Sequence, residues 1–240
     1  MLSETILNVC KPVGMTSYDV VRLIKKKTGM GKVGHAGTLD PFARGVLVVL
    51  VGKATKYFDI IVRMEKAYTG RMLLGQETDT GDPTGKIVQV SGGNEKPLAE
   101  EEIKSVFSSY RGDIYQSPHP YSAAKFRGKK LYEYARKGEM VIKPPRPIKI
   151  YSFEITGYSH PFIDFILKCS SGTYVRGLAQ EAGRRLGRYA TLVELTREAV
   201  GKFKLCDSIG YDEISGMTAD EFHNWRGMCG KEMCFHDGVF

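Results

Sequence analysis

The sequence contains few cysteines, no long apolar run and no internal repeat. Its five cysteines are odd in number and mostly scattered, which argues against an extracellular disulfide framework and indicates a reducing, cytoplasmic environment. No apolar run approaches the ~20 residues that a transmembrane helix requires. Lys11 and Pro12 interrupt the only short apolar stretch near the N-terminus, so we expect neither a signal peptide nor a membrane partner.

A standard metal-binding pattern is also missing from the sequence. Cys229, Cys234 and His236 lie close together near the C-terminus, but their spacing matches no standard zinc site, and we interpret them as structural or incidental. No low-complexity linker or sharp change in composition divides the chain. With 240 residues and 42% hydrophobic content, the sequence is sufficient for one large core or two modest ones.

Basic residues are present in excess. The 35 lysines and arginines outnumber the 27 acidic residues, which gives a net charge of +8 and favours a polyanionic partner. A merely soluble basic protein can carry the same net charge, so the distribution of the charges is more informative. Basic clusters lie beside aromatic residues at 121–134 and at 184–189, and this combination of cations and rings is typical of RNA-binding surfaces.

The hydrophobic periodicity predicts a series of helices and strands. The predicted helices span residues 17–28, 55–64, 100–110, 175–186 and 219–225. The predicted strands span residues 5–9, 46–51, 66–74, 86–90, 148–158, 162–170 and 189–198. Residues 115–147 are basic, rich in proline and irregular apart from one helical piece near 131–137, and we interpret them as a mobile lobe that closes over a substrate.

Residues 34–41, with the sequence Gly-His-Ala-Gly-Thr-Leu-Asp-Pro, form the densest group of special residues. Pro41 moves Asp40 away from helical geometry, and the apolar run 46–51 that follows is typical of a strand buried on both faces. His35 and Asp40 therefore lie on a stiff loop that enters the core, where catalytic residues are often found. The pattern alone leaves a second reading open, in which Asp40 belongs to an ordinary turn and His35 is structural.

This octet, with Phe42, Arg44 and Gly45 after it, resembles the signature loop of the TruB family of tRNA pseudouridine synthases. The resemblance implies that Asp40 is the catalytic nucleophile. Residues 172–176, Gly-Thr-Tyr-Val-Arg, are similar to a further family motif, which implies that Arg176 keeps the Asp40 carboxylate ionised in an apolar pocket. Without the first motif, Arg176 would be read as a surface arginine at the start of a helix.

The resemblance also assigns roles around the substrate. It implies that Tyr68 stacks on the target base and is a candidate for the proton step at C5. It implies that His35 fills the space left when the uridine is flipped out of its stack. The remaining positions that match substrate-binding residues of the family are Tyr174, Leu195, Lys11 and Asp82.

The fold implied by the resemblance is the α/β (α+β type) pseudouridine synthase fold, with a long, mixed, mostly antiparallel sheet flanked by helices and a central cleft. We expect a catalytic domain at residues 1–205, including the basic lobe at about 115–147, and a short extension at 206–240 that is too small for a full RNA-binding PUA domain. The expected activity is the isomerisation of uridine-55 in the T stem-loop of tRNA by a monomer, with no guide RNA, metal or cofactor.

Three alternatives remain. A non-catalytic tRNA-binding or tRNA-folding protein would keep the RNA-binding surface without the chemistry, although Asp40, Tyr68 and Arg176 are all present. An RNA-guided relative that acts on ribosomal RNA is disfavoured by the short extension. A basic α/β enzyme of another type is excluded only by the resemblance. The sequence does not decide whether the aspartate attacks C1′ of the sugar or C6 of the base.

Overall fold

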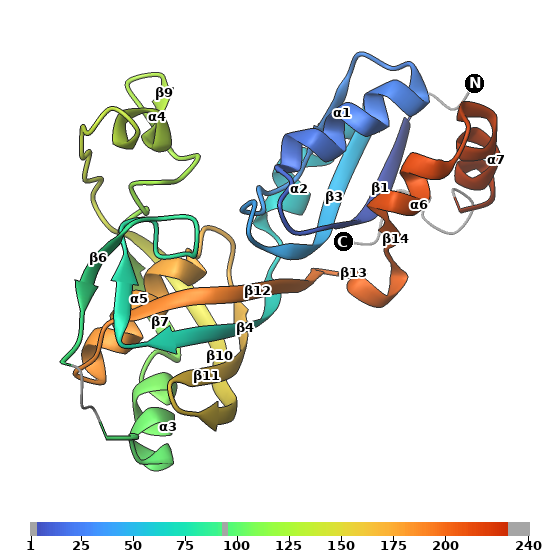
Figure 1. Cartoon of the computed structure of the whole chain (residues 1–240). Coiled ribbons are helices and arrows are strands. Elements are labelled where there is room, and N and C mark those ends of the chain that lie inside the picture. Colours follow the sequence, from blue (N-terminus) through green and yellow to red (C-terminus); the bar gives the residue numbers. More distant parts are fainter. Residues whose placement is uncertain (1–3, 93–95, 230–240) are drawn as a thin grey trace. The chain divides into compact units, whose positions relative to one another are not determined.

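The computed structural model describes residues 4–92 and 96–229, which fall into two compact units (Figure 1). Among these residues, the first unit combines residues 4–64 with residues 197–229, and the second unit comprises residues 65–92 and 96–196. Each unit contains strands of a mostly antiparallel sheet with helices against it, so the expected mixed α/β class is confirmed. The expected central cleft and the expected domain boundaries stay predictions.

The first unit is built around strand β3 (Arg44–Gly52), which pairs antiparallel with β1 (Glu4–Lys11) from Glu4 opposite Gly52 to Lys11 opposite Gly45. The parallel strand β14 (Ile209–Gly210) lies beside β1, and the next strand after β3 in the sheet order is β12 (Ala190–Val200). The first unit also contains the short strands β2 (Val33–His35) and β13 (Phe203–Lys204), and it shares β12 with the second unit.

Strand β3 is buried on both faces, as its continuous apolar run predicts. One face, with Leu47 and Val49, packs under the helices α1 (Ser17–Thr28), α6 (Tyr211–Gly216) and α7 (Ala219–Cys229). The other face, with Val46 and Val48, packs under the helices η1 (Lys53–Tyr57) and α2 (Phe58–Arg63). A short helix, η2 (Leu205–Asp207), precedes β14. Hydrophobic burial on both sides therefore holds this strand and the loop that precedes it in place.

Helix α1 has the ends that its sequence predicts. The Thr16 side chain accepts a hydrogen bond from the Asp19 amide, and the Asp19 carboxylate accepts one from the Thr16 amide. Gly29 ends the helix in the left-handed conformation, with φ of 65°.

The predicted helix at 55–64 is wrong in part, because η1 and α2 divide that segment between them. Helix α6 was not predicted.

The second unit has the strand order β12-β4-β11-β10-β7. The long hairpin of β10 (Arg146–Ser159) and β11 (Phe162–Cys169) confirms the predicted pair of strands. The other strands are β4 (Lys66–Leu74), β5 (Gln76–Thr78), β6 (Ile87–Val90), β7 (Gly112–Gln116), β8 (Lys125–Phe126) and β9 (Lys129–Lys130). The helices are α3 (Glu100–Ser108), α4 (Leu131–Ala135) and α5 (Val175–Arg185).

Aromatic rings fix helix α3 on this sheet. The ring of Phe107 lies 4.3 Å from that of Phe153, and the ring of Phe153 lies 5.2 Å from that of Phe165. Gly70 on β4 is required beneath the last ring, because a Cβ atom there would lie 2.4 Å from the Phe165 ring. Met72 and Leu74, which follow Gly70 on this face of β4, are also buried in the core.

Three expectations are adjusted by the structure. The irregular lobe is shorter than 115–147 at both ends, because β7 continues to Gln116 and β10 begins at Arg146. It contains a small β8–β9 hairpin in addition to helix α4. Strand β12 runs on to Val200, where Gly201 turns the chain into β13.

Cys234 and His236 lie outside the described residues, as does the side chain of Cys229. Among the described helices, none has the length and apolar character needed to cross a membrane.

Candidate active site

The loop that carries Asp40 joins β2 to β3, and we call residues 35–44 the aspartate loop. Its backbone is anchored at both ends. The Ala36 amide donates to the Val48 carbonyl at 2.9 Å, and the Gly14 amide donates to the Pro41 carbonyl at 2.7 Å. The Ala43 amide donates to the carbonyl of Asp40 itself at 3.1 Å, which closes a turn around the half-buried aspartate.

Two side chains from the start of the chain hold the residues next to Asp40. The Ser17 hydroxyl accepts from the Leu39 amide at 2.9 Å and donates to the Leu39 carbonyl at 3.0 Å. The Lys11 ammonium, which is 0% exposed, donates to the carbonyls of Pro12 and Met15 at 2.7 and 2.8 Å and lies 3.5 Å from that of Pro41. Ser17 and Lys11 therefore restrain the backbone immediately before and after Asp40.

A third side chain, Arg197 of β12, holds the loop from the other end of the sequence. Its Nε donates to the Val46 carbonyl at 2.7 Å, Nη1 to the Thr38 carbonyl at 3.2 Å and Nη2 to the Gly37 carbonyl at 3.1 Å. The sequence analysis missed both Ser17 and Arg197 as parts of the site. Strand β12 also carries Glu194 and Glu198, so no pattern in the sequence marks Arg197 as the buried charge that needs partners.

The loop also lies beside two buried cations. Burial lowers the pKa of Lys11 to about 8, the negative charge of Asp40 opposes this change, and the positive charge of Arg197 adds to it. With this pKa, Lys11 is still mainly charged at neutral pH. The carboxylate of Asp40 therefore interacts with a cation of its own unit, independently of Arg176 in the second unit.

In the second unit, Arg176 is the second residue of α5 and is only 4% exposed. Its Nη1 donates to the Thr80 carbonyl at 2.6 Å and its Nη2 to the Tyr121 carbonyl at 3.0 Å. Nη1 also lies 3.4 Å from the carboxylate of Asp82. The reading of Arg176 as a surface arginine is therefore wrong, because the guanidinium is buried and oriented by two loops.

Asp82 is buried and its carboxylate is used within the protein. One oxygen accepts from the Thr80 hydroxyl at 2.8 Å and from the amide and hydroxyl of Thr84 at 2.9 and 2.5 Å. The other oxygen faces Arg176. The direct contact of Asp82 with substrate stays a prediction, and its observed contacts orient Arg176.

The aromatic candidates lie on rigid elements. Tyr68 is a buried residue of β4, paired with Leu167 of β11. Tyr174 precedes α5, and its backbone is held by Gln116, whose side chain accepts from the Tyr174 amide at 2.8 Å and donates to the Tyr174 carbonyl at 3.0 Å. Both rings are thus carried by backbone whose position is fixed.

The remaining two candidates lie on strands of different units. Leu195 of β12 is buried and lines a pocket of about 320 Å³ in the second unit, together with Thr69, Arg71 and Glu194. His35 is the last residue of β2 and is half-buried. Of the predicted site residues, Lys11, His35 and Asp40 belong to the first unit, and the second unit contains Tyr68, Asp82, Tyr174, Arg176 and Leu195.

A buried histidine near Arg176 was also missed. His119 accepts from the Tyr121 amide at 3.2 Å, and the Tyr121 hydroxyl donates to Asp79 at 2.9 Å. Burial, and then the charge of Arg176, lower the pKa of His119 to about 4. The imidazole is therefore neutral at neutral pH and holds the backbone of Tyr121, whose hydroxyl reaches the loop that carries Asp79.

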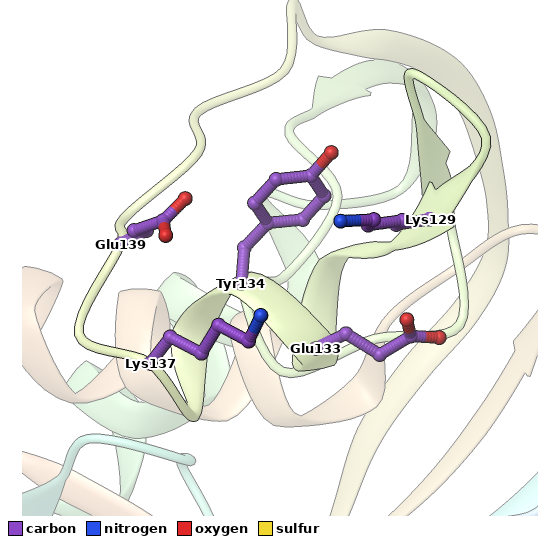
Figure 2. A pocket seen from close by; sticks show the side chains of 5 residues that line it. All are labelled: Lys129, Glu133, Tyr134, Lys137 and Glu139. Carbon is purple, nitrogen blue, oxygen red and sulfur yellow. The ribbon is translucent and has the colours of Figure 1, made fainter.

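The lobe itself contains a small pocket of about 140 Å³ (Figure 2). Its walls combine two lysines, two glutamates and a tyrosine, contributed by β9, α4 and the turn after α4: Lys129, Glu133, Tyr134, Lys137 and Glu139. Charges of both signs line it, so it lacks the uniform positive charge of a phosphate site. Within the described ranges, no three His, Cys, Asp or Glu side chains are grouped in a way that would hold a metal ion.

Comparison with known proteins gives a consistent result. The model of the TruB family pseudouridylate synthase N-terminal domain matches residues 25–175. The chain is 42% identical over 217 residues to tRNA pseudouridine synthase B of Clostridium tetani, covering 90% of this chain and 74% of that protein. It is 42% identical over 218 residues to the protein of the same name from Opitutus terrae, covering 91% of this chain and 90% of that protein.

Solved structures show a similar fold. The chain resembles that in the crystal structure of the archaeal box H/ACA sRNP Nop10-Cbf5 complex, with a TM-score of 0.65 and 26% identity over 96% of this chain. It resembles that in a Cbf5-Nop10-Gar1 complex with a TM-score of 0.69 and 28% identity over 95% of this chain. The chain spans 57% and 56% of the lengths of these two solved chains.

Proposed function

Since the chain belongs to the TruB family of pseudouridylate synthases, we propose that it converts uridine-55 in the T loop of tRNA to pseudouridine. The observation that carries this proposal is the similarity to proteins named tRNA pseudouridine synthase B, at 42% identity over about nine-tenths of the chain. The match includes Asp40, which lies on a loop restrained on both sides, as a nucleophile requires. A non-catalytic tRNA-binding protein would need no such loop.

The enzyme acts without a guide RNA under this proposal. The solved relative that belongs to a box H/ACA complex is 26% identical to the chain, whereas the tRNA enzymes are 42% identical. The higher identity favours a substrate that is recognised directly. The basic lobe supports this choice, because its exposed lysines Lys125, Lys129 and Lys130 are suited to RNA phosphates.

In the proposed reaction, Asp40 attacks the target nucleotide as a carboxylate, at C1′ of the ribose or at C6 of the base. The bond between N1 and C1′ breaks, the base rotates within the pocket, and a bond forms between C5 and C1′. The proton on C5 is then lost while N1 gains a proton, so the product is an isomer of the substrate. Asp40 leaves as a carboxylate and the net reaction consumes no co-reactant.

Arg176 and Tyr68 complete the proposed chemistry. The guanidinium of Arg176 stabilises the ionised form of Asp40, since a nearby cation favours a carboxylate over the acid. Its orientation by Thr80 and Tyr121 supports this role, because a fixed charge acts without reorganisation during the reaction. Tyr68 stacks on the base and takes part in the removal of the C5 proton.

The other candidate residues bind the RNA. Flipping the uridine out of its stack costs on the order of a few kcal/mol, and His35 recovers part of this by filling the vacated space. Tyr174 and Leu195 line the base pocket, and Asp82 contacts the substrate or acts through Arg176. Lys11 restrains the aspartate loop, which its three carbonyl neighbours support.

We also propose that residues 1–205 are the catalytic domain, that residues 206–240 are a short extension and that the protein is a cytoplasmic monomer. The extension contains β14, α6 and α7, and Ile214 and Phe222 of the two helices are buried in the same core as β3. Its described part therefore supports the element that carries the aspartate loop.

Tritium release from T-arm RNA that contains 5-tritiated uridine tests the function. We expect release by the wild type and by Asp59→Asn, a control at an exposed aspartate of the same unit, and none by Asp40→Asn. The absence of release by the wild type would support the non-catalytic alternative. Release by Asp40→Asn at the wild-type rate would show that another residue is the nucleophile.

A further inference from the structure

We propose that Arg197 is a positioning residue for the reaction: its guanidinium holds the aspartate loop so that Asp40 is in its reactive place before RNA binds. This inference rests on the proposed function, because it assumes that Asp40 is the nucleophile. Arg197 does not touch the reacting atoms in this scheme. It acts through the backbone of the loop, together with Ser17 and Lys11.

The three hydrogen bonds of Arg197 reach both sides of Asp40. Two carbonyl partners, Gly37 and Thr38, precede the aspartate, and the third, Val46, lies in the first part of β3 after it. One planar group therefore fixes the distance between the start of the loop and the strand that follows it. A lysine ammonium is a single point on a flexible stem and cannot reproduce this fork.

The backbone of Arg197 is as closely fixed as its side chain. Gly45 has φ of +113°, and a Cβ atom there would lie 2.3 Å from the Arg197 carbonyl oxygen. Any other residue at 45 would both strain the chain and collide with β12. The contact between β3 and β12 thus fixes the backbone of Arg197, and the guanidinium at the end of its side chain holds the loop.

The buried surroundings of Arg197 support the positioning role. Arg197 is 2% exposed, and its partner Val46 belongs to a strand whose aliphatic side chains fill the core. Burying a charge is unfavourable unless it is well hydrogen-bonded, and a second buried cation, Lys11, repels it. An aliphatic residue would fill such a strand position at lower cost, so the arginine is explained better by what it holds than by stability.

The test compares Arg197→Lys with the wild type by tritium release, at saturating and at limiting T-arm RNA. Because misplacement of a catalytic group by ~1 Å can reduce a rate by on the order of 100-fold, we expect kcat to fall by about 10- to 100-fold. We expect KM and the RNA dissociation constant to change less than about threefold, because the loop carbonyls do not bind RNA in this scheme. Arg22→Lys, which alters an exposed arginine of the same unit paired with Asp19, is the matched control and should keep its kcat.

The outcomes separate this inference from the proposed function. If the wild type releases tritium and Arg197→Lys retains its kcat, the inference is overturned and the proposed function stands. A loss of kcat that matches the loss of folded protein by circular dichroism would also overturn it. If Arg197→Lys does not fold, Ser17→Ala decides, since it loosens the same loop at Leu39: a fall in kcat at constant KM supports the inference, and an unchanged kcat contradicts it.

Discussion

Replacement of His119 by glutamine tests the account of the polar network behind Arg176. The imidazole of His119 is buried and accepts a hydrogen bond from the Tyr121 amide, so it must stay neutral in the folded protein. The side-chain carbonyl of glutamine can accept the same bond but does not titrate. The charged neighbours, Asp79, Asp82 and Arg176, are present in both proteins, so a comparison between them isolates the histidine.

The structure sets the size and sign of the effect. The pKa of His119 is about 4 in the folded protein and ~6.5 in the unfolded chain, so between these values only the unfolded chain binds the proton. The stabilising contribution is therefore complete above pH ~6.5 and is lost as the pH falls towards 4. Integration between pH 7 and pH 5 gives a loss of about 2 kcal/mol in the free energy of unfolding, which His119→Gln avoids.

Urea unfolding at pH 7 and pH 5, followed by circular dichroism, measures this difference. The wild type should lose about 2 kcal/mol more than His119→Gln between the two pH values. His160→Gln, at an exposed histidine of the same unit, should behave as the wild type does. Equal losses in wild type and His119→Gln would refute the assignment of a neutral, buried imidazole.

Three further predictions concern the site and the core. Arg176→Gln should lower kcat in the tritium assay by at least about 100-fold, because it removes the cation proposed for Asp40; a rate near that of the wild type would exclude that role. His35→Ala should weaken binding of T-arm RNA more than it slows single-turnover chemistry, and unchanged affinity with a lost chemical step would contradict the flipping role. Gly70→Ala should lower the melting temperature and cost about 1–3 kcal/mol, since its Cβ would lie 2.4 Å from the Phe165 ring; thermal unfolding at the wild-type temperature would show that the ring moves aside.

Much of the fold follows from local sequence patterns. Thr16 and Gly29 define helix α1 because capping and left-handed backbone geometry are local properties. The run 46–51 predicts a strand buried on both faces, and two separate clusters do cover it. The η1–α2 break and helix α6 were missed, since short helices are set by packing against the sheet more than by their own pattern.

The contents of the site were only partly predictable. Asp40 and Arg176 stand in recognisable motifs, whereas Arg197 reaches the aspartate loop across about 160 positions of sequence, the separation from Gly37. No periodicity or motif encodes such a contact. Asp82 matched a substrate-binding position, yet its observed partners are Thr80, Thr84 and Arg176, which only the folded chain reveals.

Mapping of pseudouridine in an unmodified tRNA transcript tests the central claim most directly. After incubation with the wild type, the account predicts one pseudouridine, at position 55, and after incubation with Asp40→Asn it predicts none. A modified uridine outside the T loop would contradict the proposed substrate. Pseudouridine formed by Asp40→Asn would contradict the claim that the carboxylate on this restrained loop performs the reaction.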